Sequence, residues 1–165
     1  NSAQSLPLEV ITERDKYLAR EVWMQVETNY VLISKSLFTN WITEFPEHLN
    51  FFKGLLDSSY DDFLTSPKFE QHMANSVLPN VGIMISNLDR PTDFRRHILK
   101  LAWIHIRKNI ALKIDHFNIL KGLILRTLKE SLGRGIGRDH EVAMFKVITA
   151  GFNLFSEIME TKVNE

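Results

Sequence analysis

The chain has 165 residues, of which 44% are hydrophobic and 24% charged, as in an ordinary globular protein with one sizeable core. Twenty basic and twenty acidic side chains give no net charge, which excludes an overall electrostatic footprint for nucleic acid or an anionic membrane. The absence of cysteine excludes disulfides, thiolate catalysis, iron–sulfur clusters and c-type haem attachment. No apolar run approaches membrane-spanning length and no signal peptide is visible, so we expect a cytoplasmic protein.

Helical periodicity predicts the elements of the first third of the chain. Thr12 is the expected N-cap of a first helix, whose apolar residues recur every three or four positions. A second helix is predicted over Tyr30 to Glu44, and Pro46 ends it. Residues 47–60 are rich in aromatic side chains and predict a short, irregular connection rather than a long helix.

The rest of the chain also reads as helices. Ser66 and Pro67 give an N-cap followed by proline at the first helical position, which predicts the start of a long helix through Leu88. Pro79 lies inside that helix and should kink it, because it lacks a backbone donor. Further helices are predicted over residues 93–108, 116–132 and 140–162. With no strand predicted, the fold class is all-α.

Two histidines stand in apolar-periodic segments on either side of a proline-containing break. His72 lies at the margin of one apolar face, His105 lies on the next helix, and the break at residues 87–91 lets the two helices face one another. The pair would place an imidazole on each wall of an apolar slot. Imidazole is a good iron ligand, and haem iron takes ligands above and below a flat macrocycle. The alternative is that these are ordinary structural histidines.

Other charged and glycine-rich motifs favour structural roles. The glycines between Gly133 and Gly137 lack a preceding strand and match no phosphate-binding spacing. The basic pairs Arg95-Arg96 and Arg107-Lys108 are interpreted as solvated helix faces or as cations at a haem edge. Paired carboxylates occur only in a predicted loop, so the sequence contains no interpretable acid–base site.

The spacing of several aromatic residues is typical of one known family. Trp23 lies in a first-helix segment, Pro46 is followed six residues later by Phe52, and Phe38 precedes that proline by eight residues. Together with the segment Leu101-Ala-Trp-Ile-His105, these positions resemble the globin family. The resemblance implies a three-over-three helical sandwich of about seven or eight helices around haem b. The resemblance covers about residues 18–155. We expect one domain over residues 1–165, with an extension at 1–11 and a tail at 161–165.

The resemblance also implies roles for single residues. His105 matches the proximal iron ligand, and the run from Ser66 to His72 is similar to neuroglobins, which makes His72 the distal histidine and a sixth iron ligand. Residues expected to line the haem pocket are Phe38, Phe52, Phe69, Ser76, Val77, Leu101, Ile110, Phe117 and Leu120.

The chain departs from the globin pattern at three positions. Ser76 replaces an apolar residue near the distal ligand site, and an irregularity linked to Pro79 could turn Val77 inward instead. Ile104 replaces the hydroxyl residue that orients the proximal histidine, so a backbone carbonyl such as that of Leu101 should take over. Asn75 replaces the cation that pairs with a haem propionate. The candidates for that pairing are Lys68, Lys108 and Asn109.

Three functions are compatible with these residues. The one we favour is a bis-histidyl, six-coordinate haem protein without enzymatic activity, acting in electron transfer or in redox or gas sensing. The alternatives are a reversible oxygen-binding globin with a free distal histidine, and a haem-free interaction module with a globin fold. Expected partners are haem, oxygen or another diatomic gas, and a redox partner protein. We expect a monomer or weak dimer without bound nucleic acid.

Overall fold

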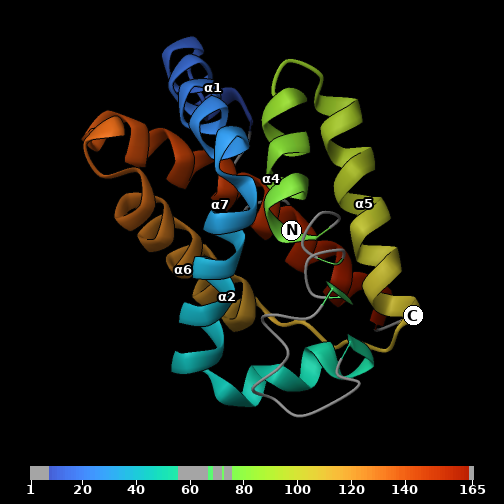
Figure 1. The fold of residues 1–165 in the computed structure, drawn as a ribbon. Coiled ribbons are helices and arrows are strands. Elements are labelled where there is room, and N and C mark those ends of the chain that lie inside the picture. Colours follow the sequence, from blue (N-terminus) through green and yellow to red (C-terminus); the bar gives the residue numbers. More distant parts are fainter. Residues whose placement is uncertain (1–7, 56–66, 69–71, 73–75, 164–165) are drawn as a thin grey trace.

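The structure is a computed structural model that describes residues 8–55, 67–68, 72 and 76–163. All regular secondary structure in these residues is helical, as the sequence predicts (Figure 1). The α-helices are α1 (Glu13–Thr28), α2 (Tyr30–Glu44), α4 (Val77–Ser86), α5 (Pro91–Arg107), α6 (Ile114–Leu132) and α7 (Arg138–Val163). The 3₁₀ segments are η2 (Leu8–Val10), η3 (Pro46–Leu55) and η5 (Gly133–Gly135).

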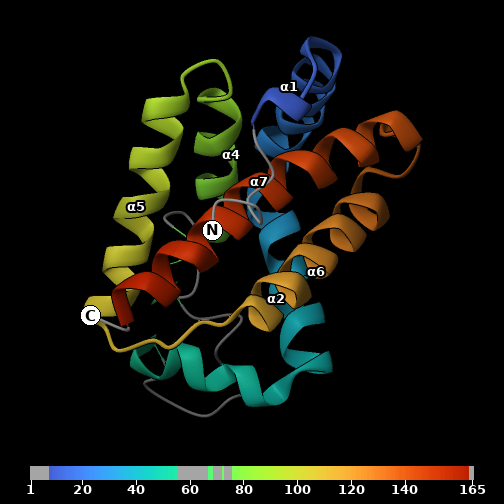
Figure 2. The ribbon, with the colours of Figure 1, turned by 180° about the vertical axis from the view of Figure 1, so that it is seen from behind.

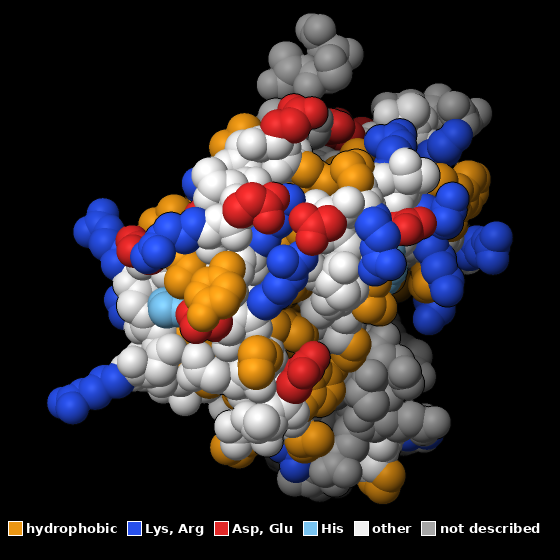
Figure 3. All heavy atoms as spheres, turned by 90° about the horizontal axis from the view of Figure 1, so that it is seen from above, with side chains coloured by type: hydrophobic (Ala, Val, Ile, Leu, Met, Phe, Trp, Pro, Cys, Tyr) orange, Lys and Arg blue, Asp and Glu red, His pale blue; other side chains and the backbone are white. Residues whose placement is uncertain are grey.

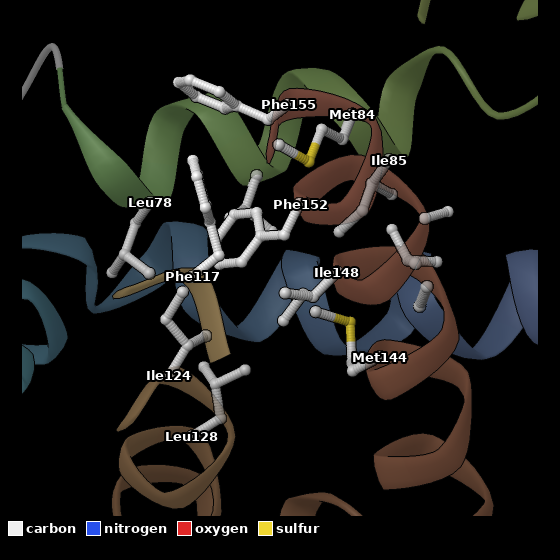
Figure 4. Close-up of a cluster of buried hydrophobic side chains, with 14 of the residues drawn as sticks. Leu78, Met84, Ile85, Phe117, Ile124, Leu128, Met144, Ile148, Phe152 and Phe155 are labelled. Carbon is white, nitrogen blue, oxygen red and sulfur yellow. The ribbon is translucent and has the colours of Figure 1, made fainter. Parts of the chain in front are cut away.

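Helix α7 is the central element of the fold. It packs against α1, α4, α5 and α6, and Figure 2 shows it crossing the molecule between these helices. Helix α2 lies against α6 and η3, while α4 packs on α1 and α5. Side chains from α4, α6 and α7 point into one apolar cluster (Figure 4). The core is therefore formed where the helices cross.

The apolar character of α7 follows from this central position. By length and composition, residues Arg138–Lys162 are long and apolar enough to cross a membrane, so the expectation that no apolar run approaches that length is wrong. However, 61% of the most apolar stretch is buried inside the protein. A helix that packs on neighbours around most of its circumference must be apolar around most of it. Burial in the core therefore accounts for the composition of α7.

The start of α1 is fixed by a capping box, as its sequence predicts. The backbone N–H of Asp15 donates to Thr12 Oγ1 at 3.0 Å, and the backbone N–H of Thr12 donates to Asp15 Oδ2 at 2.9 Å. Lys146 on α7 donates to the same carboxylate at 2.8 Å. These bonds satisfy backbone donors at the helix end and join α1 to α7.

Two segments differ from their predicted structure. Residues Pro46–Leu55 form 3₁₀ turns rather than an irregular connection, with non-helical dihedrals at Phe52. The predicted kink at Pro79 is wrong, because the break lies earlier, at Ser76, where φ is −113° and ψ is −128°. Pro79 occupies the first turn of α4, where a backbone N–H has no intrahelical partner and its loss costs nothing.

Candidate functional site

His105 is held by a hydrogen bond to its own helix. Its Nδ1 lies 2.8 Å from the backbone carbonyl of Leu101, one turn earlier in α5. A carbonyl only accepts hydrogen bonds, so Nδ1 carries the proton and Nε2 keeps its lone pair. Burial lowers the pKa of His105, and the bond to Leu101 only partly opposes this. The ring is therefore neutral at physiological pH, with Nε2 available as a metal ligand.

Aromatic side chains from α6 and α7 surround this imidazole. The ring of Phe155 meets the His105 ring edge-on at 5.3 Å between centroids. Phe117 lies 4.8 Å from Phe155 and 5.6 Å from Phe152, so the three phenylalanines form one group (Figure 4). We call His105 with these three rings the proximal cluster. It gives the imidazole an apolar, rigid setting.

Helix α5 ends shortly after His105 in a turn that folds back on it. Asn109 has a positive φ of 54°, and its backbone N–H donates to Ile106 O at 3.0 Å. The backbone N–H of Ile110 donates to His105 O, also at 3.0 Å. This pair of bonds is the Schellman motif, which closes the last turn of a helix. It holds Ile110 next to the last turn of α5, beside His105.

His72 belongs to a second aromatic group, formed with α2 and η3. Its ring lies 6.1 Å from that of Phe52, in a T-shaped arrangement. The centroid of the Phe52 ring lies 5.4 Å from that of Phe38 and 5.2 Å from that of Trp41. We call these four residues the distal cluster. Burial is the main cause that lowers the pKa of His72, so this imidazole is also neutral at physiological pH.

One cation connects the two clusters. The ammonium of Lys108 lowers the pKa of His72 and, as a smaller contribution, that of His105. The same ammonium therefore disfavours the protonated form of both imidazoles. Lys108 has no ion pair within the described part of the chain. It could therefore pair with an anionic group placed between the histidines.

Three other histidines are unsuited to metal binding. His48, His116 and His140 each accept a hydrogen bond at Nδ1, so their proton is fixed on Nε2 when the ring is neutral. The donors are Trp41 Nε1 at 2.9 Å, the backbone N–H of Lys113 at 2.9 Å and that of Gly137 at 3.1 Å. His97 interacts with the backbone of Asn80 and so belongs to the interface between α4 and α5. These features do not show in the sequence.

The remaining predicted pocket residues divide into three groups. Phe38 and Phe52 lie in the distal cluster and Phe117 in the proximal one. Val77, Leu101 and Leu120 are partly buried against the core, and Ser76 and Ile110 are also partly buried. Phe69 and Asn75 lie outside the described residues. Sequence reasoning missed Trp41, Phe152 and Phe155 as site residues, although their apolar spacing marked them as core.

A family model described as globin matches residues 35–158. The chain belongs to the globin family. Globins typically bind haem, and the family is generally not enzymatic. The globin is 27% identical to neuroglobin of Tetraodon nigroviridis and 26% identical to neuroglobin-2 of Oncorhynchus mykiss. Both alignments span 150 residues, 88% of this chain and 92% of the relative.

The fold agrees with that of a solved globin. Haemoglobin from the botfly Gasterophilus intestinalis superposes with a TM-score of 0.78, over 90% of this chain and 99% of the botfly chain. The identity of 17% makes this a likeness of fold alone. The all-α globin fold expected from the sequence is therefore confirmed.

Proposed function

We propose that this globin binds haem between the proximal and distal clusters, with His105 and His72 as the two iron ligands, and acts in electron transfer or in redox or gas sensing. When bound, haem supplies a redox-active iron with two axial positions. The observation that carries the proposal is the hydrogen bond from His105 Nδ1 to Leu101 O, which leaves Nε2 as an oriented lone pair.

Several groups of the chain fit a flat, apolar macrocycle with anionic edges. Phe52 and Phe38 offer aromatic surface beside His72, and Phe117 offers it beside His105. Lys108 supplies a positive charge near both imidazoles, which suits a propionate. Apolar walls also exclude water, which favours a stable ferrous state.

The properties of His72 support its role as second ligand. Its ring nitrogens have no hydrogen-bond partner among the described residues. Its lowered pKa favours the neutral form that a metal requires. The similarity to two neuroglobins supports the same assignment.

The test is the absorption spectrum of the purified, haem-loaded protein in its ferric, ferrous and carbon monoxide-treated forms. Two imidazole ligands give a low-spin, six-coordinate spectrum in both oxidation states. A five-coordinate, high-spin ferrous spectrum would instead support a free His72 and reversible oxygen binding. Failure to take up haem at all would support the haem-free interaction module.

A further inference from the structure

Helix α5 carries His105 on one face and a basic, aromatic face on the opposite side. Phe94, Ile98 and Ala102 are buried on the His105 side. At 100° per residue, Lys100, Trp103, Ile104 and Arg107 lie on the opposite side, one turn after another. We call these four residues the α5 stripe. They line a hollow of about 340 Å³ in the surface.

The α5 stripe exposes apolar side chains that the core does not use. Trp103 is 39% exposed and Ile104 is 38% exposed, whereas Trp23 and Trp41 are 6% and 7% exposed. Lys162 from α7 lies over the Trp103 ring, with its ammonium 5.8 Å from the ring centroid. A partly buried indole with a cation over its ring is suited to a boundary between polar and apolar phases.

Positive charge is concentrated on this helix although the chain is neutral overall. Helix α5 contains Arg95, Arg96, Lys100 and Arg107 but only one carboxylate, Asp93, and that one pairs with Arg96. Lys100 and Arg107 have no ion pair within the described residues. Figure 3 shows Lys and Arg side chains gathered along the right-hand edge, where α5 lies. Net charge alone therefore conceals a local basic surface.

A second surface hollow, between α6 and α7, has most of its cations paired with acidic side chains. It is lined by apolar residues that include Phe145 and Val142 and by three cations. Two of these cations have acidic partners, whereas Arg138 has no ion pair within the described residues. Arg126 pairs with Glu44 at 2.6 Å, and Lys129 pairs with Glu141 at 3.6 Å. The α5 stripe thus has two unpaired cations against one in this hollow, which favours α5 as the side that meets an anionic partner.

We propose that the α5 stripe docks on an anionic lipid surface, with Lys100 and Arg107 on the headgroups and Trp103 at the interface. A basic helix face with an exposed Trp is typical of peripheral membrane contact. The stripe lies along one side of a single helix, so its two cations and its indole can face the same surface. This inference goes beyond the proposed function and does not depend on how the iron is coordinated.

Co-sedimentation of the haem-loaded protein with vesicles tests the inference. The vesicles are phosphatidylcholine alone, or phosphatidylcholine with about 30% phosphatidylserine, at low ionic strength. Binding should need the anionic lipid and should weaken as salt is added. Each cation near an anionic surface strengthens binding about fivefold, so Lys100→Glu combined with Arg107→Glu should weaken it by at least about 25-fold.

Matched variants make the result specific. Arg134→Glu makes one charge reversal in η5, outside the stripe, and should leave most of the binding intact. Trp103→Ala should weaken binding several-fold without changing the circular dichroism or the haem spectrum. Absence of binding to anionic vesicles, or equal loss per charge in Arg134→Glu, would overturn the inference. So would tight binding to soluble polyglutamate without vesicle binding, which would identify an acidic protein partner instead.

Discussion

The position of one proton separates His105 from His48, His116 and His140 of this globin. His105 donates through Nδ1 to Leu101 O, whereas His116 accepts at Nδ1 from a backbone N–H. Only the first arrangement leaves Nε2 unprotonated in the neutral ring. The same residue type therefore has two different capacities, and the local backbone decides which one is realised.

This difference predicts opposite results for two alanine variants. We expect His105→Ala to lose stable haem binding, because no other proximal nitrogen is oriented in its place. His116→Ala is the control, and it should retain haem although it loses a helix-capping bond. Haem transfer to apomyoglobin measures both. Equal retention of haem by the two variants would contradict the assignment of His105.

A second prediction concerns His72. Replacing it by leucine keeps the apolar volume and removes the nitrogen, so His72→Leu should open the sixth position. We expect carbon monoxide to bind the ferrous variant at least about tenfold faster than the wild type, since no internal ligand must leave first. Stopped-flow mixing measures this rate. An unchanged rate would place His72 off the iron.

The sequence predicted the contact of His105 but not those of the other histidines. Leu101 precedes His105 by one helical turn, so helix geometry alone brings the carbonyl to the ring. By contrast, His48 contacts His116, which is far away in the chain. Such a contact depends on how η3 packs on α6, which periodicity does not specify.

At the level of elements, the capping signal at Thr12 gave an accurate helix start, and the position of a proline gave the main error. The predicted Ser66 cap lies outside the described residues, and the starts predicted at residues 93, 116 and 140 are each two residues late. Thr12 predicted the start of α1, and the bounds of α2 agree with the prediction. Pro79 was placed in mid-helix because the apolar pattern continues through Ser76. Periodicity reports which face is buried, and it does not report a single residue with non-helical dihedrals.

The contact between η3 and α6 should depend on pH. The ring centroids of His48 and His116 lie 5.3 Å apart. Each ring accepts a hydrogen bond from an N–H group, which a protonated ring cannot do. Burial is the main cause that lowers the pKa of His116, and repulsion from His48 and Lys113 adds to it, against the attraction of Asp115. The folded state therefore prefers the neutral ring. Its contribution to stability is full above about pH 6.5 and falls as the pH drops towards the lowered pKa.

Thermal unfolding at a series of pH values between about 7.5 and 5 measures this effect. His72, His97 and His105 have lowered pKa values too, so they change stability in the same direction. The relevant quantity is hence the difference in stability between the wild type and His116→Gln at each pH. The glutamine side chain still offers a hydrogen-bond acceptor. The variant should lose less stability on acidification. Parallel curves would show that His116 does not contribute.

In the packing of the whole molecule, helices α1 and α4 approach each other closely at Gly82. A Cβ atom on Gly82 would press against the indole of Trp23, which is 6% exposed and has little room to move. Gly82→Ala should therefore lower the free energy of unfolding by about 1–3 kcal/mol, despite the better helix propensity of alanine. Chemical denaturation measures it.

Gly122 on α6 is the matched control for this prediction. A Cβ atom there would meet nothing within 4 Å. Gly122→Ala should therefore raise the free energy of unfolding by about 0.5–1 kcal/mol through helix propensity alone. A similar change in both variants would mean that the packing between α1 and α4 adapts without cost.

The backbone break at Ser76 lies between His72 and the helix whose side chains enter the core. Helix α4 packs Leu78, Val81 and Met84 into the core, and it begins only after the break. A change in the position of His72 does not have to pass through a continuous helix into those buried side chains. Under the proposed coordination, the lifetime of the folded state and the rate at which His72 exchanges with an external ligand then depend on different contacts. Selection could tune the speed of such a protein's response without altering its melting temperature.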